Sequence, residues 1–233
     1  MYTNGPLWLT KGDDGGKVSG IFAVNTPCTY NEFFLMIQQI VGSVCEECFG
    51  KTQLAYKQTL EDHLIENWEI LTKEILPLDE LPIFPLQYGR IEMVGELGNM
   101  IHAINYYNIV RENPRTNFAW WSKRLDIMDE LFSTREKPIN LRFIASSPML
   151  NTPINVGDRK YVDHVFTVYT FDYAVEHNIH INCGSRKCVM ASKRNPACKN
   201  CYENNGHNEF YVNEILKCQR KKWEKYVKGK EMA

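Results

Sequence analysis

The sequence predicts an α/β protein with parallel strands, and three observations support this. Short apolar segments typical of buried strands alternate with segments that have the spacing of amphipathic helices. The 233 residues are 44% hydrophobic and 24% charged, as in an ordinary globular protein with a substantial core. No internal repeat or low-complexity linker interrupts the alternation. Because parallel pairing needs a crossover, which is usually a helix, the alternation indicates βαβ units.

The expected elements follow from these patterns in chain order. Strands are expected at residues 17–25, 90–94, 117–121, 141–145, 165–169 and 179–182, and helices at 60–75, 100–110, 125–132 and 209–226. Trp120 and Trp121 are neighbours in an expected strand, so they should point to opposite faces and at least one should be buried.

Charge and the N-terminal sequence indicate a soluble, cytoplasmic protein. The 27 Lys and Arg residues nearly balance the 28 Asp and Glu residues, so net charge favours no class of partner. Residues 1–5 lack the basic start and apolar run of a signal peptide, and no stretch reaches the roughly 18 apolar residues of a membrane span. We therefore expect no membrane partner.

The eight cysteines are expected to bind metal, because disulfides are rare in a reducing compartment. The late group has the spacing C-x4-C-x9-C-x2-C and consists of Cys183, Cys188, Cys198 and Cys201. Four thiolates complete a tetrahedral zinc site, and they equally suit a [4Fe-4S] or [2Fe-2S] cluster. His180 and His207 flank the group as substitute ligands or as exposed polar residues. Cys218 stands apart and is expected to be a buried or half-buried thiol.

The early group has only three cysteines, Cys28, Cys45 and Cys48. Three thiolates can hold a cluster in which one iron stays open for another ligand, whereas structural sites usually close their ligand shell. Alternatively, Cys45 and Cys48 belong to a small zinc site completed by a distant residue such as His63, and Cys28 is merely buried.

Polar residues follow directly after the expected strands. In folds with parallel strands, the carboxyl ends of the strands face the ligand crevice or the catalytic mouth. These residues are Cys28, Glu96, Lys123, Ser146, Ser147, Thr170 and Cys183. Two of them also have structural interpretations. Glu96 can cap the following helix, and Lys123 can be a solvated charge.

Several segments together resemble a known family. CEECFG at 45–50, IEMVGELGN at 91–99, NFAWWSK at 117–123 and the late cysteine knuckle ending in Cys201-Tyr202 occur in this order. This order is similar to that of an uncharacterised family of bacteriophage proteins with barrels like those of radical S-adenosylmethionine (SAM) enzymes. The resemblance covers most of residues 17–205. The usual triad of such barrels is C-x3-C-x2-C, whereas residues 29–44 separate the first two cysteines here.

The resemblance implies a TIM barrel-like partial (β/α) barrel at 1–182, with a cysteine-rich metal-binding knuckle and C-terminal helix at 183–233 packed on it. Cys28, Cys45 and Cys48 would hold a [4Fe-4S] cluster whose open iron takes SAM. Glu96 would contact the amino group of SAM, and Lys123 and Ser147 would line the same mouth. The late cysteines would bind a second iron-sulfur cluster or zinc. A phage-encoded protein would act in the host cytoplasm.

Two functions therefore stay open. One is a radical SAM-type oxidoreductase or transferase acting on an unknown substrate. The other is a non-enzymatic zinc-binding phage protein that serves as a nucleic-acid or host-protein interaction module. The basic segment 220–226 either grips phosphates with aromatic support or forms a solvated helix face.

Overall fold

One sheet organises the chain. The computed structural model describes residues 2–3, 5–12, 16–184, 188–190, 197–203 and 209–231. Its eight strands lie in chain order across the sheet. They are β1 (Tyr2–Thr3), β2 (Trp8–Lys11), β3 (Phe22–Val24), β4 (Tyr88–Ile91), β5 (Asn117–Ser122), β6 (Leu141–Ser146), β7 (His164–Tyr169) and β8 (Tyr211–Ile215). β1 and β2 pair antiparallel, β2 pairs antiparallel with β3, and every pairing from β3 to β8 is parallel. The predicted α/β fold with parallel strands is confirmed.

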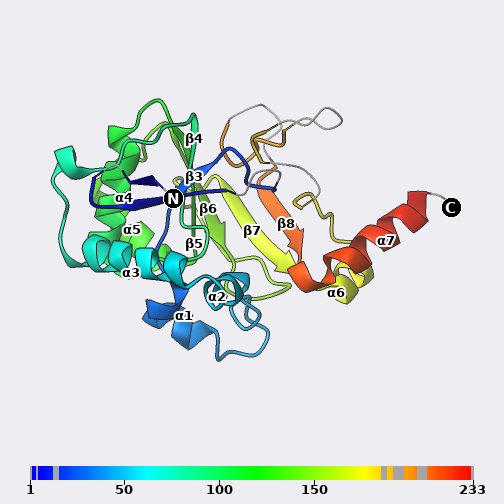
Figure 1. Ribbon diagram of the computed structural model, residues 1–233. Coiled ribbons are helices and arrows are strands. Elements are labelled where there is room, and N and C mark those ends of the chain that lie inside the picture. The colour runs from blue at the N-terminus through cyan, green and yellow to red at the C-terminus, as the bar shows by residue number, and fades with distance from the viewer. Residues whose placement is uncertain are drawn as a thin grey trace.

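Helices connect most of the parallel strands. They are α1 (Glu32–Ile37), α2 (Phe49–Leu54), α3 (Gln58–Lys73), α4 (Met100–Glu112), α5 (Leu125–Thr134), α6 (Phe171–Glu176) and α7 (Arg220–Glu231). α4 packs against both α3 and α5, and the three lie beside the same part of the sheet (Figure 1). Asn99 begins α4 by accepting a hydrogen bond from the backbone N–H of His102 at 2.9 Å. The connection from β6 to β7 has no helix.

The sheet is covered on both faces, which fits parallel strands. Phe118 and Trp120 of β5 are fully buried in the main core, together with residues of α3, α4 and α5. Ala119 and half-buried Trp121 belong to a second cluster that contains Tyr202. The prediction for the tryptophan pair is thus confirmed.

The C-terminal part differs from the sequence prediction. Residues 179–182 were expected to form a strand, and 209–226 a helix. Instead, 211–215 form β8, the parallel neighbour of β7, and the helix is α7 at 220–231. Beside β8, this part of the chain makes only an isolated parallel bridge between Cys183 and Glu214, and the side chain of Asn182 accepts a hydrogen bond from the N–H of Asn213 at 2.8 Å. Pairing with β7 therefore overrides the local helical pattern of 209–215.

The other predicted elements are present with shifted ends. The expected strand at 17–25 is reduced to β3, because 17–20 form a turn before it. The helix expected at 60–75 is α3, and the strands expected at 90–94, 117–121, 141–145 and 165–169 are β4, β5, β6 and β7. None of the helices in the described residues is long and apolar enough to cross a membrane.

Candidate metal centre

The predicted site residues Cys28, Glu96, Lys123 and Ser147 follow β3, β4, β5 and β6, respectively. These four strands are adjacent and parallel. Because their carboxyl ends meet at one edge of the sheet, their following loops are brought to the same edge. We call this the carboxyl edge.

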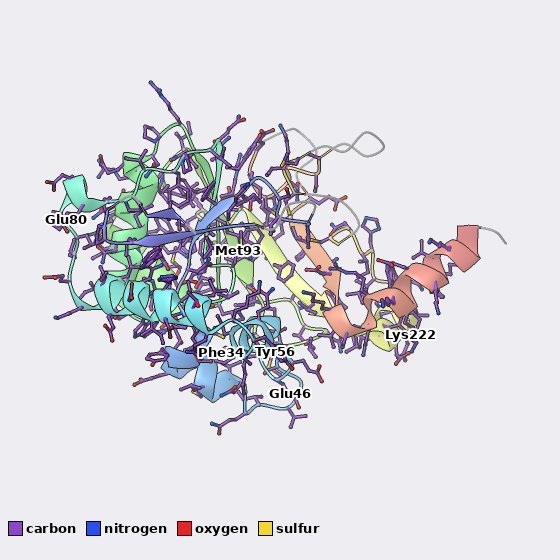
Figure 2. All side chains as sticks on the ribbon, in the orientation of Figure 1. Phe34, Glu46, Tyr56, Glu80, Met93 and Lys222 are labelled. Atoms are coloured by element: carbon purple, nitrogen blue, oxygen red, sulfur yellow. The ribbon has the colours of Figure 1, made fainter. Side chains whose placement is uncertain are left out.

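The structure brings the three early cysteines into one cluster. Cys28 begins a 3-10 turn, Cys45 lies in the turns between α1 and α2, and Cys48 is the residue before α2. All three contribute to a small core with Phe34 and Leu64. In Figure 2, the labels of Phe34, Glu46 and Tyr56 mark this α1–α2 region. The long segment between Cys28 and Cys45 is therefore α1 and a turn that returns to the first thiol.

The early thiols differ in acidity. A hydrogen bond from the Cys28 thiol lowers the pKa of Cys48 to about 6; burial opposes this shift, and the backbone N–H groups of Lys51 and Gly50 reinforce it. The same bond, together with burial, raises the pKa of Cys28. Burial raises the pKa of Cys45, against the opposing charge of Lys123. Cys48 is therefore the thiol of the group whose pKa is lowered.

Glu96 and Lys123 form an ion pair beside these thiols. The Oε2 atom of Glu96 lies 3.6 Å from the Nζ atom of Lys123. The Glu96 carboxylate also accepts a hydrogen bond from the Ser122 hydroxyl at 2.5 Å. It accepts two more from backbone N–H groups, that of Lys123 at 2.8 Å and that of Leu97 at 2.9 Å. Burial alone would lower the pKa of Lys123, but Glu96 and the cysteines at 45 and 48 together raise it. A protonated lysine thus faces two of the three thiols.

Ser147 organises a loop. Its hydroxyl donates to the carbonyl of Thr152 at 2.5 Å and accepts from the N–H of Met149 at 3.2 Å. This loop pairs with the segment that leads to Cys45, because the N–H of Val44 donates to the carbonyl of Pro148 at 2.9 Å. Ser147 is therefore linked to the early group through the backbone.

A buried carboxylate that the sequence analysis did not select lies in the loop after β4. Glu92 has a φ of 58° and is 2% exposed. Burial raises its pKa to about 7, although the Thr26 and Tyr106 hydroxyls oppose this shift. In the sequence, Glu92 is a charged residue inside an apolar strand pattern. That position could have marked it as a candidate, because a buried charge needs several hydrogen-bond partners.

The late cysteines also come together, away from the early group. All four line a cavity of about 300 Å³. Two of them are anchored by backbone hydrogen bonds: the N–H of Cys183 donates to Asn213 in β8, and the N–H of Cys188 donates to Lys17. Lys17 also donates from Nζ to the Cys183 sulfur at 3.1 Å. Burial raises the pKa of Cys183 to about 11, against the charge of Lys17.

The remaining candidates have other surroundings. The ring of His63 lies 3.7 Å from the ring of Trp8. His180 lines the late cavity but is largely exposed, and His207 lies outside the described residues. Cys218 was expected to be at least half buried. It is exposed, because a 3-10 turn precedes α7 and places it outside that helix.

Thiol sulfur is the donor type shared by zinc and iron-sulfur centres, and both cysteine groups supply it. All eight cysteines are free. Among the residues that the structure describes, no group of three or more His, Cys, Asp or Glu side chains already has the arrangement of a metal-ion site.

Comparison of the chain with protein-family models, curated proteins and solved structures found no match.

Proposed function

We propose that Cys28, Cys45 and Cys48 bind a [4Fe-4S] cluster with one open iron, and that the protein is a radical SAM-like enzyme. The observation that carries this proposal is the gathering of three thiols from separate turns at the carboxyl edge. The open iron is the position for SAM, and the substrate is a molecule still to be identified.

The order of the strands supports the proposal. β3 to β8 follow one another in chain order and are all parallel. This is the order of strands in a (β/α) barrel, whose catalytic groups lie at the carboxyl ends of the strands. We therefore interpret the sheet as a partial barrel and the carboxyl edge as its mouth.

The chemistry of the donors fits the cluster. The pKa of Cys48 is lowered by its hydrogen bond from Cys28, and ligands of iron must be deprotonated. Lys123 supplies a positive charge near Cys45 and Cys48, which offsets the negative charge of bound thiolates.

Each residue has a specific role in the proposed site. When bound, the cluster and SAM would supply reductive cleavage and a radical that abstracts hydrogen. The three cysteines hold the iron, and Lys123 and Ser147 line the mouth. Both oxygens of Glu96 already accept hydrogen bonds. A contact from Glu96 to the amino group of SAM would therefore be shared with Ser122 and Lys123.

The late cysteines are proposed to form a second centre, with either zinc or a second iron-sulfur cluster. Their cavity contains all four thiols and borders Lys17. If this were the protein's only metal and the metal were zinc, a non-enzymatic interaction module would be the better description.

The deciding experiment is anaerobic reconstitution with iron and sulfide, followed by iron, sulfide and zinc analysis and a visible spectrum. Cys45→Ser should lose close to four irons and four sulfides per chain relative to the wild type. The matched control is Cys218→Ser, which removes an exposed thiol outside both groups and should bind as much iron as the wild type.

Zinc without sulfide in the wild type, unchanged by Cys45→Ser, would rule out the early cluster and favour the zinc-binding module. If the early cluster forms, SAM cleavage with dithionite as reductant is the next assay. The 5′-deoxyadenosine formed should be absent in Cys45→Ser.

A further inference from the structure

The loop that carries Cys28 and the loop that carries Glu96 are joined by one buried carboxylate. Glu92 Oε2 accepts hydrogen bonds from the backbone N–H groups of Thr26 and Gly95, both at 3.1 Å. Oε1 accepts from the Thr26 hydroxyl at 2.5 Å and from the Tyr106 hydroxyl at 2.6 Å. Thr26 is two residues before Cys28, and Gly95 directly precedes Glu96. A single side chain thus bridges the two loops.

Other hydrogen bonds join the same two loops on either side of Cys28. The side chain of Asn25 accepts from the backbone N–H of Met93. The side-chain amide of Asn31 donates to the carbonyls of Glu96 at 2.8 Å and Leu97 at 3.1 Å. Cys28 is therefore bracketed by contacts to the loop after β4. Glu92 is the contact that uses a charged group inside the protein.

The geometry also explains the Gly95-Glu96 pair in the sequence. A Cβ atom at Gly95 would lie 2.4 Å from Glu92 Oε2 and 2.4 Å from the carbonyl oxygen of Thr26. No side chain fits there while the bridge is closed. Gly95 is thus required by close approach of the two loops.

The backbone at Glu92 is held in an unfavourable conformation. A positive φ is uncommon outside glycine and is unfavourable for a residue with a side chain. It turns the Glu92 side chain back toward the loop after β3, and Arg90 Nε supports the turn by donating to the Glu92 carbonyl at 3.0 Å. Such strain is often found where the backbone orients functional groups.

We propose that Glu92 is a positioning residue that holds Cys28 and Glu96 at a set separation across the mouth. The inference rests on the proposed cluster at the early cysteines. Glu92 touches neither metal nor substrate; it acts through the Thr26–Cys28 loop and the Gly95–Glu96 loop. Residues that orient metal ligands through hydrogen bonds change metal affinity by roughly 10- to 100-fold.

The test compares variants that open the bridge with variants that keep it. Glu92→Ala removes both acceptor oxygens and with them all four hydrogen bonds, and Gly95→Ala forces the loops apart. Glu92→Gln keeps an oxygen for the two N–H groups, while its amide can donate to the two hydroxyls, which can rotate. Tyr106→Phe is the matched control, because it removes a hydrogen bond to Glu92 that does not span the two loops.

Two measurements are made on each variant. Amide hydrogen exchange of residues 25–31 and 92–97 in the metal-free protein reports the bridge itself. A Co²⁺ titration, followed by thiolate-to-cobalt absorption, reports metal binding; the early-site signal is the part lost in Cys45→Ser. We expect faster exchange and at least about tenfold weaker early-site binding in Glu92→Ala and Gly95→Ala. Glu92→Gln and Tyr106→Phe should stay within about threefold of the wild type.

The possible failures are distinguishable. If Glu92→Ala exchanges faster but binds Co²⁺ as the wild type does, the positioning role is overturned and the proposed cluster stands. Unchanged exchange in both opening variants would also overturn it. If the wild type shows no Co²⁺ signal that depends on Cys45, the proposed function itself fails, and the positioning role fails with it.

Discussion

Individual residues at the carboxyl edge show how burial and hydrogen bonding divide chemical roles among similar side chains. Cys28 and Cys48 share one hydrogen bond, yet the bond favours the thiol of the first and the thiolate of the second. Glu92 and Glu96 are both buried, but only Glu96 has a lysine beside it. Two residues of the same type thus have different electrostatic surroundings within one loop.

Glu92 predicts a pH dependence of folding stability. Burial raises the pKa of Glu92 from an ordinary value of 4.5 to about 7. Between pH 4.5 and about 7, the folded protein therefore keeps a proton on Glu92 that the unfolded chain has released. The stabilisation is present below about pH 4.5 and is lost as the pH rises to about 7, by at most about 3 kcal/mol. Chemical denaturation at several pH values should show this loss. Buried His102 and Tyr106 and the charge of Glu96 face the same carboxylate.

Glu92→Gln isolates this contribution, because it mimics the protonated form. The difference in unfolding free energy between Glu92→Gln and the wild type should grow in favour of the variant from pH 4.5 to 7. A difference that stays constant over this interval would show that Glu92 keeps an ordinary pKa.

At the scale of elements, α7 carries a run of basic residues that suits an anionic partner. Its aromatic residues do not face solvent as a stacking platform: Trp223 and Tyr226 pack edge-on against Phe171. Lys222 pairs with Asp172 at 2.9 Å, and Arg220 pairs with Glu214. This leaves an exposed stripe of Lys221, Lys225 and Lys228, which have helical spacing and span roughly 10 Å.

We expect this stripe to bind nucleic-acid phosphates, because three lysines at helical spacing present positive charge along one side of α7. Changing all three lysines to Glu should weaken binding of a fluorescent oligo-dT by more than tenfold. It should also make the slope of log affinity against log salt shallower by about 2. Fluorescence anisotropy measures both quantities.

The matched control has the same change in net charge at scattered positions: Lys57, Lys73 and Lys160, all exposed, are changed to Glu. Equal losses in the two triple variants would show that only overall charge matters. Binding to anionic vesicles that depends on the stripe, without oligo-dT binding, would instead indicate a lipid surface.

At the scale of the whole molecule, the late cysteines connect distant parts of the chain. The backbone N–H of Cys188 donates a hydrogen bond to the carbonyl of Lys17, which lies before β3. The backbone N–H of Cys183 donates to the carbonyl of Asn213 in β8. Cys188 and Cys201 also pack against the face of the sheet that holds Tyr88 and Ile144. A metal at this site would therefore cross-link the N-terminal and C-terminal parts of the sheet, whereas the early group joins neighbouring loops.

Loss of the late metal should consequently destabilise the fold more than loss of the early one. We expect Cys201→Ser to lower the Tm of the metal-loaded protein by more than Cys48→Ser does, by about 2–4 °C for each kcal/mol lost. Calorimetry of both variants, with and without a chelator, measures this. The ranking would be refuted by an equal or larger shift in Cys48→Ser, or by a chelator that leaves the wild-type Tm unchanged.

Much of the candidate site followed from local patterns. The residues that follow four strands were predicted because strands and helices alternate, and the structure places Cys28, Glu96, Lys123 and Ser147 at one edge. Glu92 was missed because the expected strand continued to residue 94, whereas β4 ends at Ile91 and the backbone turns at Glu92. A positive φ has no signature in a sequence when the residue is not glycine or asparagine.

The sequence by itself determined the fold class, the main helices and the two cysteine groups, because periodicity and ligand spacing are local properties of the chain. Only the tertiary structure decided that 211–215 form β8, that α1 brings Cys45 back to Cys28, and that Glu92 bridges two loops. These features depend on partners far away in the chain. Their free energy comes from non-local pairing and burial, which override local preference.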